Sequence, residues 1–87
     1  MRAKALVARN LRRLRVRLGL SQEGLAVDAG IDRTYVSRLE RGLENPTVAV
    51  LEQLAGALHA EIVEFFAVPR PGEPAPTPLR GGRKRKV

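Results

Sequence analysis

Apolar residues recur in the first 66 residues of this chain at the three- and four-residue spacing that is typical of amphipathic helices. One apolar stripe lies in residues 4–18, ahead of Gly19, and consists of Leu6, Val7, Leu11, Leu14 and Leu18. Another follows Thr47, a good helix cap, and consists of Val48, Leu51, Leu54, Ala55 and Leu58. This pattern predicts an all-α fold.

Residues 21–42 (SQEGLAVDAGIDRTYVSRLERG) predict two short helices joined by a tight turn. The hydroxyl of Ser21 can cap the first helix, and Gly30 supplies the backbone freedom that an abrupt helix end needs. Asp32 can cap the second helix, which is expected from residue 33 to residue 41 and is closed by Gly42. Two helices joined in this way form the helix-turn-helix pattern.

The second of these helices has two different flanks. At about 100° per residue, Tyr35, Val36 and Leu39 share one flank, which we expect to pack against the rest of the domain. The opposite flank presents guanidinium and hydroxyl groups, which belong to Arg33, Thr34, Ser37, Arg38 and Arg41. We expect this flank to meet a partner.

Residues 20–47 (LSQEGLAVDAGIDRTYVSRLERGLENPT) resemble the signature of the xenobiotic-response-element (XRE) family, the lambda-repressor and Cro type of DNA-binding domain. The matched positions are Leu20, Ser21, Gln22, Leu25, Ala26, Gly30, Ile31, Val36, Ser37, Leu39, Glu40, Gly42, Asn45 and Pro46. A more local likeness, around Asp32 to Tyr35, is to the small controller proteins of restriction-modification systems. The resemblance implies a compact five-helix domain, which we expect over residues 1–67.

The resemblance also implies a sequence-specific DNA-binding regulator of transcription that places residues 33–41 in the major groove as a symmetric dimer. Arginine can pair with guanine through two hydrogen bonds and hydroxyl groups can bond single base edges, so the expected base contacts are Arg33, Thr34, Ser37 and Arg38. Backbone N–H groups at a helix N-terminus hold phosphates well. The expected phosphate contacts are Ser21 and Gln22 at such a terminus, with Arg41 and Asn45 beyond the recognition helix. An antitoxin-like or bridging protein-interaction module with the same fold is the alternative.

Two further expectations concern the domain's own structure. In the family the position of Arg15 pairs with a glutamate near the end of the recognition helix, where this chain has Glu40. A partly buried carboxylate at the border of the packed flank needs such a cationic partner. A last short helix over residues 61–66 brings Ile62, Phe65 and Phe66, which in the family either pack on the core or form a two-fold interface. We expect them to share both roles in a homodimer.

The net charge of +7 is unevenly placed: residues 1–18 carry +7, residues 19–66 carry −5 and residues 67–87 carry +5. Basic ends favour an anionic partner such as double-stranded DNA, or they serve only to keep a small protein in solution. The chain has no cysteine and a single histidine, His59, and no carboxylate pair is tied to a nucleophile. We therefore expect no enzyme activity, no metal, no cofactor and no small-molecule ligand.

Residues 68–87 (VPRPGEPAPTPLRGGRKRKV) hold most of the prolines and end in a basic cluster, so we expect an extended, disordered tail. The cluster either adds non-specific attraction to DNA or only solubilises the chain. No apolar run approaches the roughly 18 residues of a membrane-spanning helix, and the N-terminus lacks the apolar core of a signal peptide, so a cytoplasmic protein is expected.

The chain departs from the family pattern at two positions. Gly24 stands where the family usually has the glutamate of a capping box, which weakens the first helix of the motif. His59 stands where the fourth helix often ends in glycine.

Overall fold

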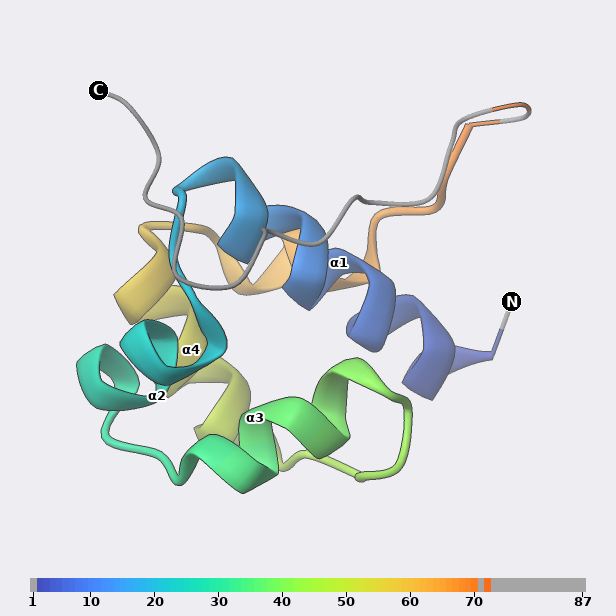
Figure 1. The fold of residues 1–87 in the computed structure, drawn as a ribbon. Coiled ribbons are helices and arrows are strands. Elements are labelled where there is room, and N and C mark those ends of the chain that lie inside the picture. The colour runs from blue at the N-terminus through green and yellow to red at the C-terminus, as the bar shows by residue number, and fades with distance from the viewer. Residues whose placement is uncertain (1, 71, 73–87) are drawn as a thin grey trace.

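The computed structural model describes residues 2–70 and 72, and all regular structure in them is helical. The elements are α1 (Ala3–Arg17), α2 (Gln22–Ala29), α3 (Arg33–Glu40), α4 (Val48–Leu58) and the 3₁₀ helix η1 (Ile62–Phe66) (Figure 1). The predicted all-α class is confirmed, while the fifth predicted helix is a 3₁₀ helix. The predicted tail lies outside the described residues except for positions 68–70 and 72.

Three helices begin at a side chain that accepts a hydrogen bond from the first turn. Ser21 Oγ accepts from the Gly24 N–H at 2.9 Å, and Thr47 Oγ1 accepts from the Val50 N–H at 3.1 Å. Asp32 Oδ2 accepts from the Thr34 N–H at 2.9 Å. Each bond satisfies one of the N–H groups that a helix leaves without an internal partner, so these starts are set by local sequence.

All four α-helices end at a residue in the left-handed conformation, with a bond from the following N–H group back into the last turn. For α3 the N–H of Leu43 donates to the carbonyl of Arg38 at 2.9 Å, with Gly42 between them at φ +74°. Glycine fills this position in the first three helices, but α4 ends at His59 with φ +54°. A side chain in this conformation is strained, so His59 carries a cost that glycine avoids.

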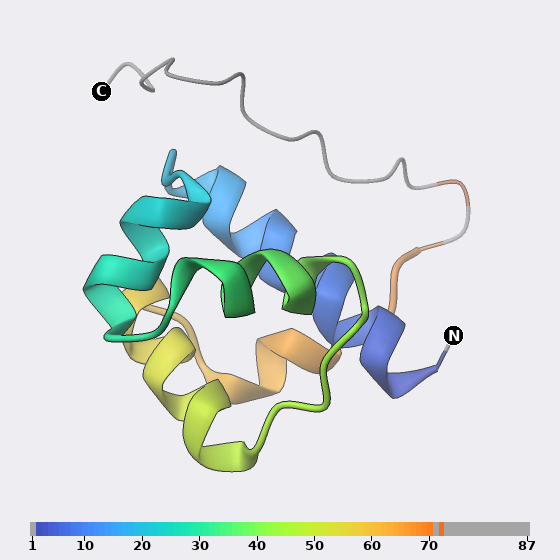
Figure 2. The ribbon, with the colours of Figure 1, turned by 60° about the horizontal axis from the view of Figure 1, so that its bottom comes forward.

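The helices enclose one apolar core. α1 packs against α3 and η1, and α2 packs against α3 and α4 (Figure 1). The buried side chains include Phe65 and the leucines that formed the predicted stripes, except for Leu18. Leu18 and Val48 are exposed because they lie just beyond the end of α1 and at the first position of α4. In Figure 2 α3 crosses the front of the domain.

Asn10 joins the last segment to the first helix. Its Nδ2 lies 2.9 Å from the carbonyl oxygens of both Phe65 and Ala67, and 3.0 Å from that of Leu6. Its Oδ1 accepts from Arg13 Nε at 3.0 Å. Asn10 therefore holds the end of η1 on α1 through Phe65 and Ala67, two carbonyl groups that take their bonds from a side chain instead of from the next turn of a helix.

No helix in the described part of the chain is both long and apolar enough to span a membrane.

Candidate nucleic-acid interface

Helix α3 buries one side in the core and exposes polar side chains on its outer side. Val36 and Leu39 are buried in the core, whereas Arg33, Thr34 and Arg38 are exposed. Ser37 is half-buried between them. The four residues expected to contact bases therefore all come from the eight-residue helix that crosses the front of the domain (Figure 2). Ser37 is the least accessible of the four.

Tyr35 lies at the border between the two flanks of α3 and is half-buried against the core. Burial raises the pKa of its phenol, and the negative charge of Glu44 raises that pKa further. Glu44, in the loop after α3, therefore places a negative charge beside this face.

Glu44 also bonds Arg38 directly. Arg38 Nε donates to Glu44 Oε2 at 2.7 Å, and Arg38 Nη2 makes a long contact of 3.5 Å with the carbonyl oxygen of Leu43. This partner of Arg38 was not predicted from the sequence. The available signal was an acidic residue that follows the helix stop at Gly42 and lies six positions after Arg38.

The residues expected at phosphates lie at both ends of the motif. Ser21 is exposed at the start of α2, where its hydroxyl accepts from Gly24, so a phosphate there would be met by backbone N–H groups. The Gln22 side chain instead turns inward and donates to Glu40 Oε1 at 3.1 Å. Arg41 and Asn45 are exposed beyond the end of α3.

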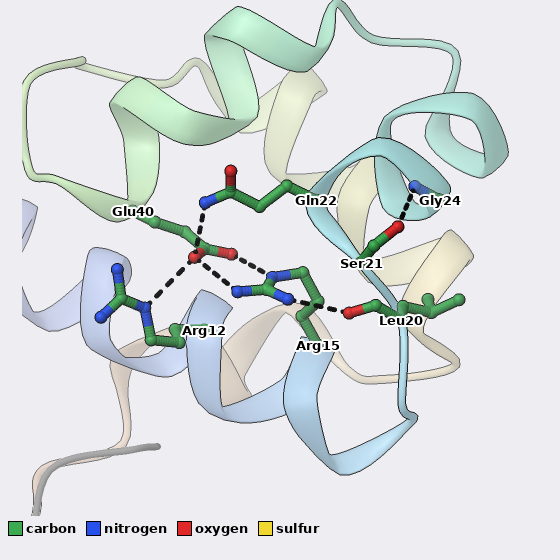
Figure 3. Close-up of polar contacts among 7 residues, drawn as sticks. All are labelled: Arg12, Arg15, Leu20, Ser21, Gln22, Gly24 and Glu40. Atoms are coloured by element: carbon green, nitrogen blue, oxygen red, sulfur yellow. Dashed lines mark hydrogen bonds and ion pairs between the residues drawn. The ribbon is translucent and has the colours of Figure 1, made fainter. Parts of the chain in front are cut away.

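Glu40, at the end of α3, is buried and receives donors from two other helices (Figure 3). Arg15 donates through Nε to Glu40 Oε2 at 2.5 Å and through Nη2 to Oε1 at 2.9 Å. Arg12 Nε, from the same helix as Arg15, donates to Oε1 at 3.2 Å, and Gln22 adds its bond from α2. The structure thus brings Arg15 and Glu40 together, in a cluster that joins α1, α2 and α3.

The cluster determines the ionisation of Glu40. Burial by itself raises the pKa of this carboxyl, but hydrogen bonds from Arg15, Gln22 and Arg12, together with the positive charge of Arg15, outweigh it. The pKa of Glu40 is therefore held below its ordinary value, and the residue is an anion at neutral pH. Arg15 Nη1 donates to the Leu20 carbonyl at 2.8 Å, so the guanidinium is also bonded to the chain that leads into α2.

A hollow of about 320 Å³ opens between α1 and the end of α3. Three arginines line it together with Glu40 and the small residues Ala5, Ala8 and Gly42; the arginines are Arg9, Arg12, which bonds Glu40, and Arg41. The positive charge of α1 therefore reaches the C-terminal end of α3, next to the loop that carries Asn45.

The three residues expected at a dimer contact have different surroundings. Phe65 is fully buried in the core, so its side chain offers no surface to a second copy. Ile62 is half-buried, and Phe66 is 42% exposed. Val63 on the same segment is 68% exposed, so the apolar surface of η1 consists of Ile62, Val63 and Phe66.

Within the described residues, no group of three or more His, Cys, Asp or Glu side chains lies close enough together to hold a metal ion.

Comparison with known proteins agrees with the helix-turn-helix arrangement of α2 and α3. The helix-turn-helix family model HTH_3 matches residues 11–65. An HTH-type transcriptional regulator of Sinorhizobium fredii, itself uncharacterised, is 46% identical over 65 residues, which make up 75% of this chain and 84% of that protein.

Solved structures of restriction-modification controller proteins are also similar. The controller C.AhdI from Aeromonas hydrophila superposes with a TM-score of 0.71 at 43% identity, over 72% of this chain and 96% of that one. The controller C.Esp1396I, solved as a tetramer on its natural 35 base-pair operator, gives a TM-score of 0.70 at 33% identity, over 76% of this chain and 87% of that one.

Proposed function

This chain belongs to the helix-turn-helix family HTH_3, and from that premise we propose that it is a DNA-binding regulator of transcription that reads its operator in the major groove as a symmetric dimer. The observation that carries the proposal is the arrangement of α3. Its apolar side is buried in the core, and its outer side presents two arginines and a threonine at the front of the domain.

The chemistry of this face suits base edges. The Arg33 guanidinium, at the first residue of α3, can donate two hydrogen bonds to O6 and N7 of one guanine, and Arg38, five residues later, can do the same. Thr34 can meet a thymine methyl group or exchange a single hydrogen bond. Half-buried Ser37 lies between these residues and can reach a base or a phosphate. The N-terminal part of the helix would thus lie against the bases.

Contacts to the DNA backbone would fix the register of α3 in the groove. Backbone N–H groups at the start of α2, at Ser21 and Gln22, would hold one phosphate, and Arg41 and Asn45 would hold the next stretch of backbone. The arginines that line the hollow beside α1 add positive charge on the same side as Arg41. Such contacts position the protein and carry no sequence information themselves.

The dimer would form through η1, where Ile62, Val63 and Phe66 present apolar side chains. A two-fold dimer places its two recognition helices in major grooves that are one helical turn apart, roughly 34 Å. The operator would then be a pair of inverted half-sites. The alternative, an antitoxin-like or bridging module, is not favoured, because the relatives are transcriptional regulators and a similar controller was solved on its operator. The regulator would act in the cytoplasm.

The first experiment selects bound sites from random DNA and then measures affinity by fluorescence anisotropy. We expect Arg33→Ala to weaken binding to the selected site by about 5- to 150-fold, the range of a lost bidentate contact, and to relax preference at one position of each half-site. Arg17→Ala, an exposed arginine of α1 that pairs with Glu64, is the matched control and should leave preference unchanged. If Arg33→Ala weakened the selected site and random DNA equally, Arg33 would be a backbone contact. Failure of selection to enrich any sequence would refute the proposed function.

A further inference from the structure

Glu44, in the loop after α3, bonds Arg38, which is one of the two exposed arginines on the outer side of α3. Arg38 Nε and Glu44 Oε2 lie 2.7 Å apart, a short distance for a charge-assisted bond. The side chain of Arg38 is 46% exposed and that of Glu44 is 27% exposed. Surface ion pairs of this kind contribute little to stability, so this pair has little value as a fold-stabilising contact.

The path of the backbone after α3 brings Glu44 close enough to bond Arg38. Gly42 adopts the left-handed conformation that ends α3, and the chain then turns back so that the Leu43 N–H donates to the carbonyl of Arg38 itself. Glu44 is the next residue. The backbone that carries Glu44 is therefore placed beside Arg38 by a helix-capping motif, so the carboxylate needs only its own side chain to reach the guanidinium.

The bond with Glu44 leaves one end of the guanidinium available. Nε bonds Glu44, and Nη2 has its long contact with Leu43, so both occupied donors lie on one edge of the planar group. Nη1 bonds none of the described residues, and together with the outer hydrogen of Nη2 it forms a second fork. A fork of this kind is what guanine O6 and N7 accept in the major groove.

We propose that Glu44 determines the specificity of the site by acting as a positioning residue for Arg38. It holds the guanidinium so that its free fork faces base edges, and its own charge repels phosphate oxygens. An arginine without this partner could turn to a phosphate or to several bases, because its side chain has many rotamers. Glu44 therefore lowers affinity for DNA in general and raises discrimination at the base pair that Arg38 contacts. This inference rests on the proposed function.

The test uses the full chain with the variants Glu44→Ala, Glu44→Gln, Arg38→Ala and the double variant Arg38→Ala/Glu44→Ala. Anisotropy at one salt concentration measures affinity for the selected site, for its single-base variants and for random DNA. The position at which Arg38→Ala loses preference identifies the base pair in question. Glu52→Ala removes the same charge from an exposed position on α4 and is the control.

We expect Glu44→Ala to tighten binding to random DNA several-fold and to lower discrimination at that base pair by about tenfold, within the range of one bidentate contact. Glu44→Gln loses the charge but keeps an oxygen that accepts from Arg38 Nε, so it should tighten random binding while keeping most of the discrimination. In the Arg38→Ala background, Glu44→Ala should change discrimination no further. Glu52→Ala should leave discrimination at its parental value.

Unchanged discrimination in Glu44→Ala would overturn the inference while leaving the proposed function intact. An equal loss of discrimination with and without Arg38 would also overturn it, because Glu44 would then act independently of Arg38. If Glu44→Ala tightened the selected site more than random DNA, Glu44 would be a restraint that specific binding must break, contrary to the proposal. A parent protein that failed to distinguish sites would instead refute the proposed function itself.

Discussion

The buried carboxylate of Glu40 lies in the cluster that joins α1, α2 and α3. Replacing Glu40 therefore tests how much this cluster stabilises the domain. Glu40→Ala removes the acceptor for Arg15, Arg12 and Gln22 at once. Arg12 is one-third exposed and can turn to water, but the side chain of Arg15 is only 5% exposed. Among the described residues, Arg15 keeps only its bond to the Leu20 carbonyl, so a charge is left buried without a counterion.

The expected loss is large for a domain of this size. Removing one partner of a fully buried ion pair costs about 3–5 kcal/mol, and Arg12, which is one-third exposed, adds little to that. A domain of this length has a free energy of unfolding of about 3–10 kcal/mol, so Glu40→Ala should remove a third of it or more. At about 4–8 °C per kcal/mol, the melting temperature should fall by at least about 12 °C.

Thermal and urea unfolding followed by circular dichroism measure the effect. Arg17→Ala is the matched control, because its 3.8 Å pair with Glu64 is exposed and should cost less than about 1 kcal/mol. The double variant Arg15→Met/Glu40→Met leaves no buried charge and should be more stable than Glu40→Ala. It also keeps the test usable if Glu40→Ala does not fold. A Glu40→Ala protein that melts like Arg17→Ala, or a double variant that is no more stable than Glu40→Ala, would refute the coupling.

Two further predictions concern how stability changes at low pH and how it depends on the residues in the left-handed conformation at helix ends. Because the folded-state pKa of Glu40 lies below its ordinary value, its contribution to stability is present above the unfolded pKa of about 4.3 and is lost as pH falls through the lower folded value. The stability difference between the parent and Glu40→Gln, measured by urea unfolding, should therefore shrink as pH is lowered below about 4, and a constant difference would contradict the pKa shift. His59→Gly should raise the free energy of unfolding by about 1 kcal/mol because it removes a side chain from φ +54°. Gly30→Ala, at φ +69°, should lower it by a similar amount, and equal stability of both variants with the parent would show that these helix ends are not strained.

Much of the fold was predictable because its causes are local. The caps at Ser21, Asp32 and Thr47 and the stop at Gly42 lie within a few residues of the backbone groups that they satisfy, so sequence alone indicates where the helices begin and end. Helical periodicity likewise indicated the buried flank of α3, since adjacent turns share a face whatever packs against them.

The surroundings of individual side chains could not be predicted in the same way, because they depend on contacts between residues that are far apart in the sequence. Phe65 and Phe66 are neighbours of the same type, yet the first is buried in the core and the second is exposed. That difference arises where the 3₁₀ segment is held against α1, by an Asn10 bond that spans 55 positions.

The same limit applies to the candidate interface. From the sequence, Gln22 and Arg38 were predicted to contact DNA, but the bond of Gln22 to Glu40 and that of Arg38 to Glu44 were not predicted. Glu40 lies 18 positions from Gln22, and Glu44 reaches Arg38 only because the chain turns back at Gly42. By itself, the sequence determined which groups could donate and where the helices would carry them. Which acceptor each donor meets was decided by the tertiary structure, because a hydrogen bond needs its atoms within about 3 Å and only the packed helices set that distance.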